Sequence, residues 1–277
     1  MTVRELLQDA VKKLQQARVD APRRDAELLL MFVWGISNTE LIIKMQDELP
    51  QDFITPFEAL LQRRLKREPL AYILGKKEFW SHDFVVTPDV LVPRPETEHL
   101  IESVLKYYPN QEGFYTFFDI GTGSGCIAVT LALEYPNATV TACDISEEAL
   151  LVAKKNAERL GVTKRMKFFV GDLYQALPEK SSFDLIVSNP PYVSLYEMLD
   201  LEPELAQEPR FALTDEGTGL TLLEKLLAGA NKYLNEQGML MLESGLCGMP
   251  ETPETLEKLE DYFDLAGNFR GSVFKKL

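Results

Sequence analysis

The pattern of hydrophobic and polar positions changes once along the 277-residue chain. In the first ~75 residues apolar side chains recur at intervals of three and four, the spacing that predicts amphipathic helices. In the first helix these side chains are Val3, Leu6, Leu7, Ala10, Val11 and Leu14. Thr2 and Glu5 form a capping-box pattern at its start. From about residue 97 short apolar runs alternate with helical stretches, which predicts an α/β region.

Proline and glycine mark the expected ends of the other N-terminal helices. Pro22 is expected to begin the second helix and Gly35 to end it, because proline suits the first turn of a helix and glycine the residue after its last turn. For the next long helix, Thr55 is the expected N-cap and Pro56 the first-turn proline. Pro69 is expected to stop that helix.

The second region is predicted to contain strands that alternate with helices. The strand candidates are 115–120, 138–143, 166–170, 183–188, 238–243 and 271–276. Helices are expected near 97–108, 125–135, 146–160, 217–235 and 253–262. Alternation of this kind predicts a doubly wound parallel sheet, whose ligands bind at the carboxyl ends of the strands.

The connection between the two regions is predicted where the pattern changes. Residues 78–80 and 84–86 are strand-like runs around a short polar turn. Pro88, Pro93 and Pro95 follow and exclude a long helix there. We therefore divide the chain into a helical domain at 1–77, a hairpin and linker at 78–96, and an α/β domain at 97–277.

The charge of the chain is −14 and unevenly distributed. Residues 1–88 hold 13 basic and 13 acidic residues, so the whole acidic excess lies in residues 89–277. An acidic body repels phosphate backbones, which weakens the case for a nucleic-acid substrate. The run Arg63-Arg64-Leu65-Lys66-Arg67 goes against this trend. It is interpreted either as a solvated helix face or as a docking surface for an acidic partner or RNA.

Composition disfavours several other classes of protein. The three cysteines are odd in number and far apart, which argues against a disulfide framework. Without a CxxC pair, and with His82 and His99 as the only histidines, we expect no metal site. No apolar run approaches the ~18 residues of a membrane span, and the N-terminus lacks the pattern of a signal peptide. We expect a monomeric cytoplasmic protein with no membrane partner and no stable nucleic-acid partner.

A glycine-rich turn follows the first predicted strand of the α/β region. It reads Asp119-Ile120-Gly121-Thr122-Gly123-Ser124-Gly125 and leads into a helical stretch. Such a turn lets a ligand approach the backbone and offers free N–H groups at the helix start. Because Cys126 stands where the dinucleotide fingerprint needs glycine or alanine, the pattern fits a nucleoside or amino-acid ligand better than a pyrophosphate. A tight structural turn is the alternative.

Acidic residues follow at the ends of the next two predicted strands. Asp144, next to Ile145, lies at the distance beyond the glycines from which a carboxylate accepts hydrogen bonds from both ribose hydroxyls. The alternative is an acid that merely favours the helix start at Ser146. Asp172 is placed to accept from an adenine amino group, with Leu173 packing on the ring. Three consecutive strand ends that each carry a suitable group favour a nucleoside ligand.

The fourth predicted strand ends in Asn189-Pro190-Pro191-Tyr192. Two prolines remove two backbone donors and fix an extended turn whose carbonyl oxygens are free to accept. A planar NH2 group could be held by the Asn189 side-chain oxygen and the Pro190 carbonyl, with Tyr192 stacked on its plane. The two acceptors would draw positive charge onto the nitrogen and hold it in line for methyl transfer. A rigid loop is the alternative.

Together these motifs resemble the class I methyltransferases of the amino-methylating branch, which act on DNA, ribosomal RNA or protein glutamine. Other segments are similar to the family of release-factor glutamine methyltransferases. They are Tyr72-Ile73-Leu74-Gly75, Glu78-Phe79-Trp80, Val92-Pro93-Arg94-Pro95-Glu96-Thr97-Glu98, Leu201-Glu202-Pro203-Glu204-Leu205, Glu208-Pro209-Arg210-Phe211-Ala212-Leu213 and Asp264-Leu265-Ala266-Gly267 with Arg270. The similarity extends over the whole chain and is weakest in the helical region.

The resemblance implies a seven-stranded Rossmann-like methyltransferase sheet that uses S-adenosylmethionine as its cofactor. The expected cofactor-binding residues are Asp119, Gly121, Thr122, Gly123, Ser124, Gly125, Asp144, Ile145, Asp172, Leu173 and Asn189. Residues 189–192 would hold the glutamine of the Gly-Gly-Gln tip of bacterial-type peptide-chain release factors, with Asn189, Pro190 and Tyr192 as catalytic residues. The helical domain would dock the release factor away from that tip. The chain departs from the family at Ser244, where His or Ile is common, and in 246–254.

Two alternatives remain open from the sequence. A DNA or RNA amino methyltransferase uses the same N-P-P-Y chemistry, but it needs a basic channel or a recognition domain. Only the run at 63–67 favours it. A non-catalytic cofactor-binding protein on the same fold would be expected to lose Asn189 or the acidic strand ends, and the chain keeps all of them.

Overall fold

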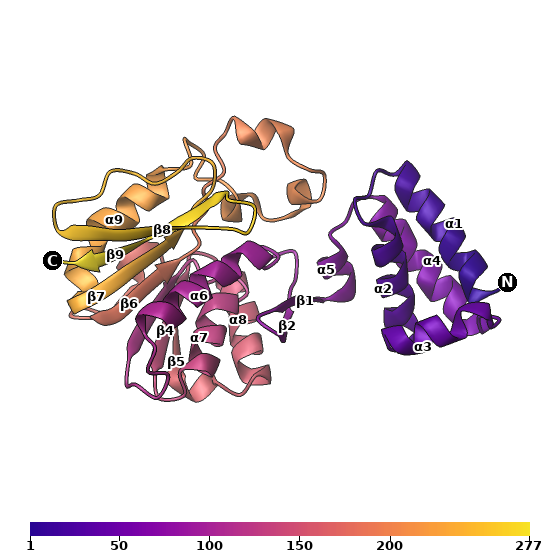
Figure 1. Cartoon of the computed structure of the whole chain (residues 1–277), viewed down its shortest axis with the longest axis horizontal. Coiled ribbons are helices and arrows are strands. Elements are labelled where there is room, and N and C mark those ends of the chain that lie inside the picture. The colour runs from indigo at the N-terminus through magenta and orange to yellow at the C-terminus, as the bar shows by residue number, and fades with distance from the viewer. The chain divides into compact units, whose positions relative to one another are not determined.

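The structure is a computed structural model that describes all 277 residues and separates into two compact units. The helical unit contains Met1–Gly75 together with Glu202–Gln207, and the sheet unit contains Lys76–Leu201 and Glu208–Leu277 (Figure 1). The helical unit is therefore built from two stretches that are distant in sequence. No single helix is long and apolar enough to cross a membrane. One pair, Pro22–Trp34 with Asn38–Gln46, meets the length and composition criterion only when the two are taken together across a 102° bend.

The helical unit consists of five helices: α1 (Val3–Gln16), α2 (Pro22–Trp34), α3 (Asn38–Ile43), α4 (Gln51–Leu65) and α5 (Leu70–Leu74). The predicted capping box is confirmed, because Glu5 N donates to Thr2 Oγ1 and Thr2 N donates to Glu5 Oε2. The predicted limits of α2 are also confirmed, and Gly35 ends it with a φ of 69°. The apolar faces of α1, α2 and α4 meet in one core.

The prediction for the start of α4 was wrong. The helix begins at Gln51, after Pro50, so that Pro56 lies inside it rather than in its first turn. Proline within a helix removes one backbone hydrogen bond. The added turn places Phe53 against Trp34, with ring centroids 5.9 Å apart. Tertiary packing has overridden a local capping signal.

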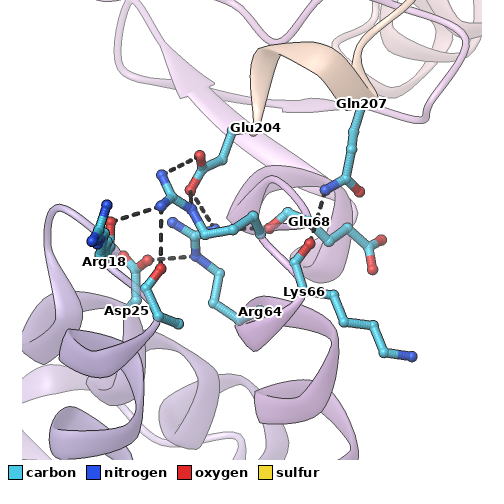
Figure 2. Close-up of polar contacts among 9 residues, drawn as sticks. Arg18, Asp25, Arg64, Lys66, Glu68, Glu204 and Gln207 are labelled. Atoms are coloured by element: carbon cyan, nitrogen blue, oxygen red, sulfur yellow. Dashed lines mark hydrogen bonds and ion pairs between the residues drawn. The ribbon is translucent and has the colours of Figure 1, made fainter. Parts of the chain in front are cut away.

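A buried ion-pair network closes the helical unit around Arg64 of α4 (Figure 2). The Arg64 side chain is 7% exposed; it donates through Nε to Asp25 at 2.7 Å and through Nη1 to Glu204 at 2.8 Å. Arg67 donates to both carboxylate oxygens of Glu204, at 2.6 and 2.5 Å. Burial alone would raise the pKa of Glu204, but the hydrogen bonds from Arg67 and Arg64 outweigh it and lower the pKa.

The other contacts of the basic run are also internal. Arg67 donates to the carbonyl oxygens of Ala17 and Arg18, and Gln207 donates to the Lys66 carbonyl at 3.1 Å (Figure 2). Arg63 pairs with Glu68 at 2.5 Å. The run is therefore neither a free docking surface nor only a solvated face, because two of its arginines hold residues 202–207 in place.

The sheet unit contains a seven-stranded sheet in the order β5-β4-β3-β6-β7-β9-β8. The strands are β3 (Thr116–Ile120), β4 (Thr139–Asp144), β5 (Met166–Val170), β6 (Phe183–Ser188), β7 (Leu234–Glu243), β8 (Leu256–Phe263) and β9 (Phe269–Lys276). The strands from β5 to β7 pair in parallel. β9 runs antiparallel to both β7 and β8. The seven-stranded Rossmann-like sheet is confirmed, but it is mixed rather than wholly parallel.

The helix expected at 253–262 is wrong, because most of this segment forms the edge strand β8. Its sequence, Leu256-Glu257-Lys258-Leu259-Glu260-Asp261-Tyr262-Phe263, is rich in residues that favour helices. Charged side chains are also common on edge strands, where they oppose pairing with other chains. Pairing with β9 decides the outcome here, as Leu256 and Tyr262 are buried while the charged residues lie at the surface.

Helices cover both faces of the sheet (Figure 1). One face packs on α6 (Glu98–Tyr107), α7 (Cys126–Glu134) and α8 (Glu147–Arg159), and the other packs on α9 (Thr221–Tyr233). A hairpin of β1 (Lys76–Phe79) and β2 (His82–Val85) precedes them, turning through Trp80 and Ser81 with positive φ values. The parallel strands all point their carboxyl ends to one edge, where the predicted motifs lie.

Candidate active site

A cleft lies at the carboxyl ends of β3 to β6, with about 1120 Å³ of empty space, the open solvent at its mouth included. The predicted residues that line it are Gly121, Thr122, Gly123, Ser124, Asp144, Ile145, Asp172, Leu173, Asn189 and Pro191. The structure therefore brings the three strand-end motifs and the start of the tetrapeptide into one cavity. Four predicted residues do not line it: Asp119, Gly125, Pro190 and Tyr192.

The glycine turn has two kinds of glycine. Gly121 and Gly123 have φ values of 70° and 54°, and a Cβ at either would meet nothing within 4 Å. Their positive φ favours glycine, and the space beside them is open to a ligand. Gly125, with φ of 81°, is different, because a Cβ there would lie 3.0 Å from the Cβ of Ala153 on α8. It serves the packing of α7 against α8 and not the cleft.

Asp119 supports the glycine turn from the protein interior. It is fully buried and accepts a hydrogen bond from Thr122 Oγ1 at 2.6 Å, while its other carboxylate oxygen has no partner. Burial raises the pKa of Asp119 to about 7. Ser124, which lines the cleft, also has a buried hydroxyl without a partner. Buried polar atoms are normally hydrogen-bonded, so the unpartnered Ser124 hydroxyl in the lining of the cleft fits a polar ligand.

Asp144 at the end of β4 contacts the helix start at Ser146, as one of the two sequence interpretations expected, while its binding of ribose stays a prediction. One carboxylate oxygen accepts from Gly123 N at 2.8 Å and the other accepts from Ser146 N at 3.0 Å. It thus ties the glycine turn to the start of α8. Burial raises the pKa of Asp144, and hydrogen bonds from Ser146 and Gly123 oppose that rise. Each oxygen keeps acceptor capacity toward the cleft, because a carboxylate oxygen has two lone pairs.

The end of β5 contributes a strained residue. Leu173 lines the cleft with a φ of 48°, a left-handed conformation that costs a non-glycine residue about 1–2 kcal/mol. Asp172 beside it is exposed. Strain of this kind persists where the surroundings hold the backbone, and it is found at ligand sites.

The tetrapeptide at 189–192 is held at both of its ends. Asn189 Nδ2 donates to Thr97 Oγ1 at 3.0 Å, whereas Asn189 Oδ1 accepts no hydrogen bond within the protein. The Tyr192 hydroxyl donates to Glu243 Oε1 at 3.2 Å. Burial raises the pKa of Tyr192 well above its usual range, so it stays a neutral donor. Pro190 is buried between these two anchors.

Two glycines allow this close packing. A Cβ at Gly219 would lie 2.2 Å from the Tyr192 carbonyl oxygen, and a Cβ at Gly245 would lie 2.8 Å from the Tyr192 ring. Both distances are too short for any other residue. Ser244, where the chain departs from the family, is fully buried, and its hydroxyl donates to the Gly248 carbonyl at 2.5 Å.

The sequence interpretation assigned no role to Thr97, Glu243, Gly219 or Glu208. Glu208 is buried and accepts from Val92 N at 2.9 Å and from Arg94 at 2.5 Å, which holds the cleft-lining Arg94 in place. The only signal for Thr97 and Glu208 was their place in segments similar to the family, and Gly219 and Glu243 lie outside those segments. Nothing in the local sequence shows that they converge on the tetrapeptide.

Comparisons with known proteins agree with this geometry. Residues 5–75 match the family described as the PrmC N-terminal domain, and residues 98–246 match the methyltransferase small domain. A release factor glutamine methyltransferase of Nitratidesulfovibrio vulgaris is 42% identical over 245 residues, covering 88% of this chain and 82% of the relative. One from Cereibacter sphaeroides is 43% identical over 246 residues, covering 88% and 86%.

Among solved structures, a methyltransferase from Pyrococcus furiosus is similar with a TM-score of 0.50 and 22% identity. The match covers 78% of this chain and 96% of that one, and it supports the fold alone. The sequence relatives go further, because they span both units at more than 40% identity. The chain belongs to the family of release factor glutamine methyltransferases.

Proposed function

We propose that this chain transfers a methyl group from S-adenosylmethionine to the side-chain amide nitrogen of the glutamine in the Gly-Gly-Gln motif of peptide-chain release factors. The observation that carries the proposal is the state of Asn189. Its Nδ2 is engaged by Thr97 while its Oδ1 is left without a partner, beside a cleft lined by the glycine turn. An acceptor so placed suits an NH2 group and would repel a carboxylate or carbonyl.

The residues of the cleft fit S-adenosylmethionine. Gly121 and Gly123 leave open space beside the backbone, Ser124 offers a buried hydroxyl, and Asp144 offers acceptor capacity at the strand end. Bound there, the cofactor supplies a methyl group already activated by its positively charged sulfur. Methyltransferases in general use this cofactor, and the family match covers the segment that contains these residues.

The protein's own part in the reaction is to hold the nitrogen. An amide nitrogen is a weak nucleophile because its lone pair is delocalised into the carbonyl group. Asn189 Oδ1 and the Pro190 carbonyl would accept from the two amide hydrogens, and Tyr192 would pack on the plane of the amide. Charge that develops on the nitrogen is then stabilised by fixed dipoles, and the nitrogen is held in line with the methyl group.

The release factor as substrate is supported by the printed names of the relatives, which are 40–43% identical. We further propose that the helical unit docks the release factor, because residues 5–75 match a domain specific to this family. Release factors act on ribosomes, so a protein that methylates them is expected in the cytoplasm. The basic run no longer favours RNA, since Arg64 and Arg67 are committed to Glu204.

The test is a radiolabelled methyl-transfer assay with three substrates: purified release factor, its Gln→Ala variant in the Gly-Gly-Gln tip, and total RNA. We expect label on the unmodified release factor alone. Label on RNA would instead assign the chain to the nucleic-acid branch. If none of the three substrates is labelled although the protein binds the cofactor, the proposed substrate is refuted, and the proposed cofactor site still stands.

A further inference from the structure

Arg94 is the one basic side chain in the lining of the cleft, which also has three acidic side chains, those of Asp89, Asp144 and Asp172. The proposed cofactor carries positive charge on its sulfonium and its ammonium group and negative charge on its carboxylate. An anion that leaves water needs a partner, because burying an unpaired charge is costly. Of the side chains that line the cleft, only that of Arg94 supplies a positive charge for this carboxylate.

The glycine turn offers the carboxylate few other donors. Backbone N–H groups at the start of a helix commonly bind anions, and free N–H groups were expected at this turn. In the structure four of the five N–H groups at 121–125 already donate within the protein, to oxygen atoms of Thr122, Cys143 and Asp144. These four donors are Gly121, Thr122, Gly123 and Gly125. Their commitment favours the Arg94 side of the cleft as the place where an anion binds.

The Arg94 side chain is held in place with most of its donors unused. Its Nη2 atom donates to Glu208 Oε1 at 2.5 Å, and Glu208 is itself fixed because its Oε2 atom accepts from Val92 N at 2.9 Å. The Glu208 side chain is 1% exposed, whereas that of Arg94 is 31% exposed. A guanidinium group has five N–H donors in a planar fork, and the bond to Glu208 is the one that Arg94 makes with its side chain. The other donors are available to a carboxylate, whose geometry this fork fits.

The position of Arg94 agrees with the direction in which the cofactor must lie. Thr97 N donates to the Arg94 carbonyl at 3.2 Å, so Arg94 is one turn away from the threonine whose hydroxyl accepts from Asn189. Arg94 therefore belongs to the part of the cleft beside β6, whereas Asp144 and Asp172 follow β4 and β5. A short carbon chain joins the carboxylate of the cofactor to its sulfur, and methyl transfer requires that sulfur near Asn189.

We propose that Arg94 binds the carboxylate of S-adenosylmethionine and thereby sets the direction of the cofactor in the cleft. Its methionine part then lies toward the end of β6 and its adenosine part toward the ends of β4 and β5. The inference rests on the proposed function for the identity of the cofactor. Because a guanidinium fork can bind both oxygens of a carboxylate, Arg94 also makes the cleft select the whole cofactor over related nucleosides that lack this group.

The test is a binding cycle with two ligands, S-adenosylmethionine and decarboxylated S-adenosylmethionine, which differ in the carboxylate alone. Titration calorimetry on the unsubstituted protein should show that the decarboxylated ligand binds about tenfold to a hundredfold more weakly, the range for hydrogen bonds to a charged group. Arg94→Gln should weaken the binding of S-adenosylmethionine by about the same factor. The same substitution should leave the binding of the decarboxylated ligand nearly unchanged, so that the preference between the ligands disappears.

Two further variants separate binding from stability. Arg94→Gln leaves Glu208 buried without its cation, a change that destabilises proteins. The double variant Arg94→Gln with Glu208→Gln removes both charges, and we expect it to lose the preference in the same way. Arg210→Gln is the matched control, because Arg210 pairs with Glu216 while both side chains are more than half exposed, and it does not line the cleft. This variant should keep the full preference for S-adenosylmethionine.

Three results would overturn the inference: a full preference for S-adenosylmethionine in Arg94→Gln, an equal loss of affinity for both ligands in that variant, or equal binding of the two ligands by the unsubstituted protein. None of these measurements involves a release factor. A protein that gives the expected cycle but never labels a release factor would refute only the proposed substrate. Failure of the unsubstituted protein to bind either ligand would refute the proposed cofactor and this inference together.

Discussion

The two units differ in whether every buried polar side chain has a partner. In the helical unit Arg64 and Asp25 are buried, and both are fully engaged in the network with Glu204. In the sheet unit four buried side-chain atoms have no partner: Asp119 Oδ1, Ser124 Oγ, Thr130 Oγ1 and Glu243 Oε2. Three of these four belong to residues that line the cleft or directly support its turn or its tetrapeptide.

The difference distinguishes polar groups that stabilise the fold from polar groups that are available to bind a ligand. A buried charge that only stabilises a fold must be fully paired, because nothing else will compensate for its lost hydration. A binding site can leave polar atoms unpaired in the free protein, because the ligand supplies the missing partner. Removing a polar group should therefore lower stability in the helical unit and lower turnover or affinity in the sheet unit.

The largest expected effect is on stability, from Arg64→Ala. The substitution leaves Asp25 and part of Glu204 buried without their cation, and breaking a buried pair costs about 3–5 kcal/mol. Amide hydrogen exchange in α2 and α4 should report this loss. Arg63→Ala is the control, because Arg63 is 44% exposed and pairs only with Glu68, a type of contact worth about 0–1 kcal/mol. Equal effects from the two substitutions would contradict the role given to the network.

The next effect is on turnover, from Asn189→Ala. Losing one of the two acceptors for the substrate nitrogen should lower kcat by about a hundredfold, with only a small fall in melting temperature from the lost hydrogen bond to Thr97. Asn137→Ala, at an exposed asparagine bonded to Glu112, should leave turnover unchanged. A fully active Asn189→Ala would show that the proposed hold on the nitrogen is wrong.

Asp144→Asn should act on affinity rather than on turnover. The amide retains an acceptor for Gly123 but loses the charge and one acceptor position, so we expect about tenfold weaker binding of the cofactor, the scale of a hydrogen bond to a charged group. Titration calorimetry measures this directly. Turnover at saturating cofactor should return to that of the unsubstituted protein, and an unchanged dissociation constant would reject the ribose assignment.

The smallest effect is expected from Ser124→Ala. If the buried hydroxyl waits for a ligand atom, its removal should weaken cofactor binding by about two- to tenfold, the range for one neutral hydrogen bond. The free protein should become no less stable, since an unpartnered buried hydroxyl contributes nothing to the fold. A loss of stability in the absence of cofactor would mean that Ser124 already has a structural partner.

The cleft lining at the ends of β3 to β5 was predictable because its residues are neighbours in sequence. The glycine turn and the acidic strand ends each occupy a few consecutive positions, and the topology of parallel strands brings them together. The antiparallel end of the sheet, formed by β8 and β9, was not predictable in the same way. Residues 256–263 have a composition that suits a helix, and only their pairing with β9, which a single sequence does not show, makes them a strand.

The tetrapeptide end of the cleft was predictable only in part. Asn189 to Tyr192 form a recognisable sequence motif, but Thr97 and Glu243, which hold them, lie 92 and 51 residues away along the chain from their respective partners. A lone threonine in a proline-rich segment and a lone glutamate at a strand end have no local pattern that marks them. Thr97 and Glu243 reach the tetrapeptide because the start of α6 lies beside the carboxyl ends of β6 and β7.

The presence of residues 202–207 in the helical unit bears on how this family can be recombined. A chimera that joins a relative's residues 1–75 to this sheet unit would separate Glu204 from Arg64 and Arg67, the two arginines with which it pairs in this chain. The helical unit is thus encoded by two separate stretches of the chain. We expect an exchange of the helices between family members to give a folded protein only when residues 202–207 are exchanged with them.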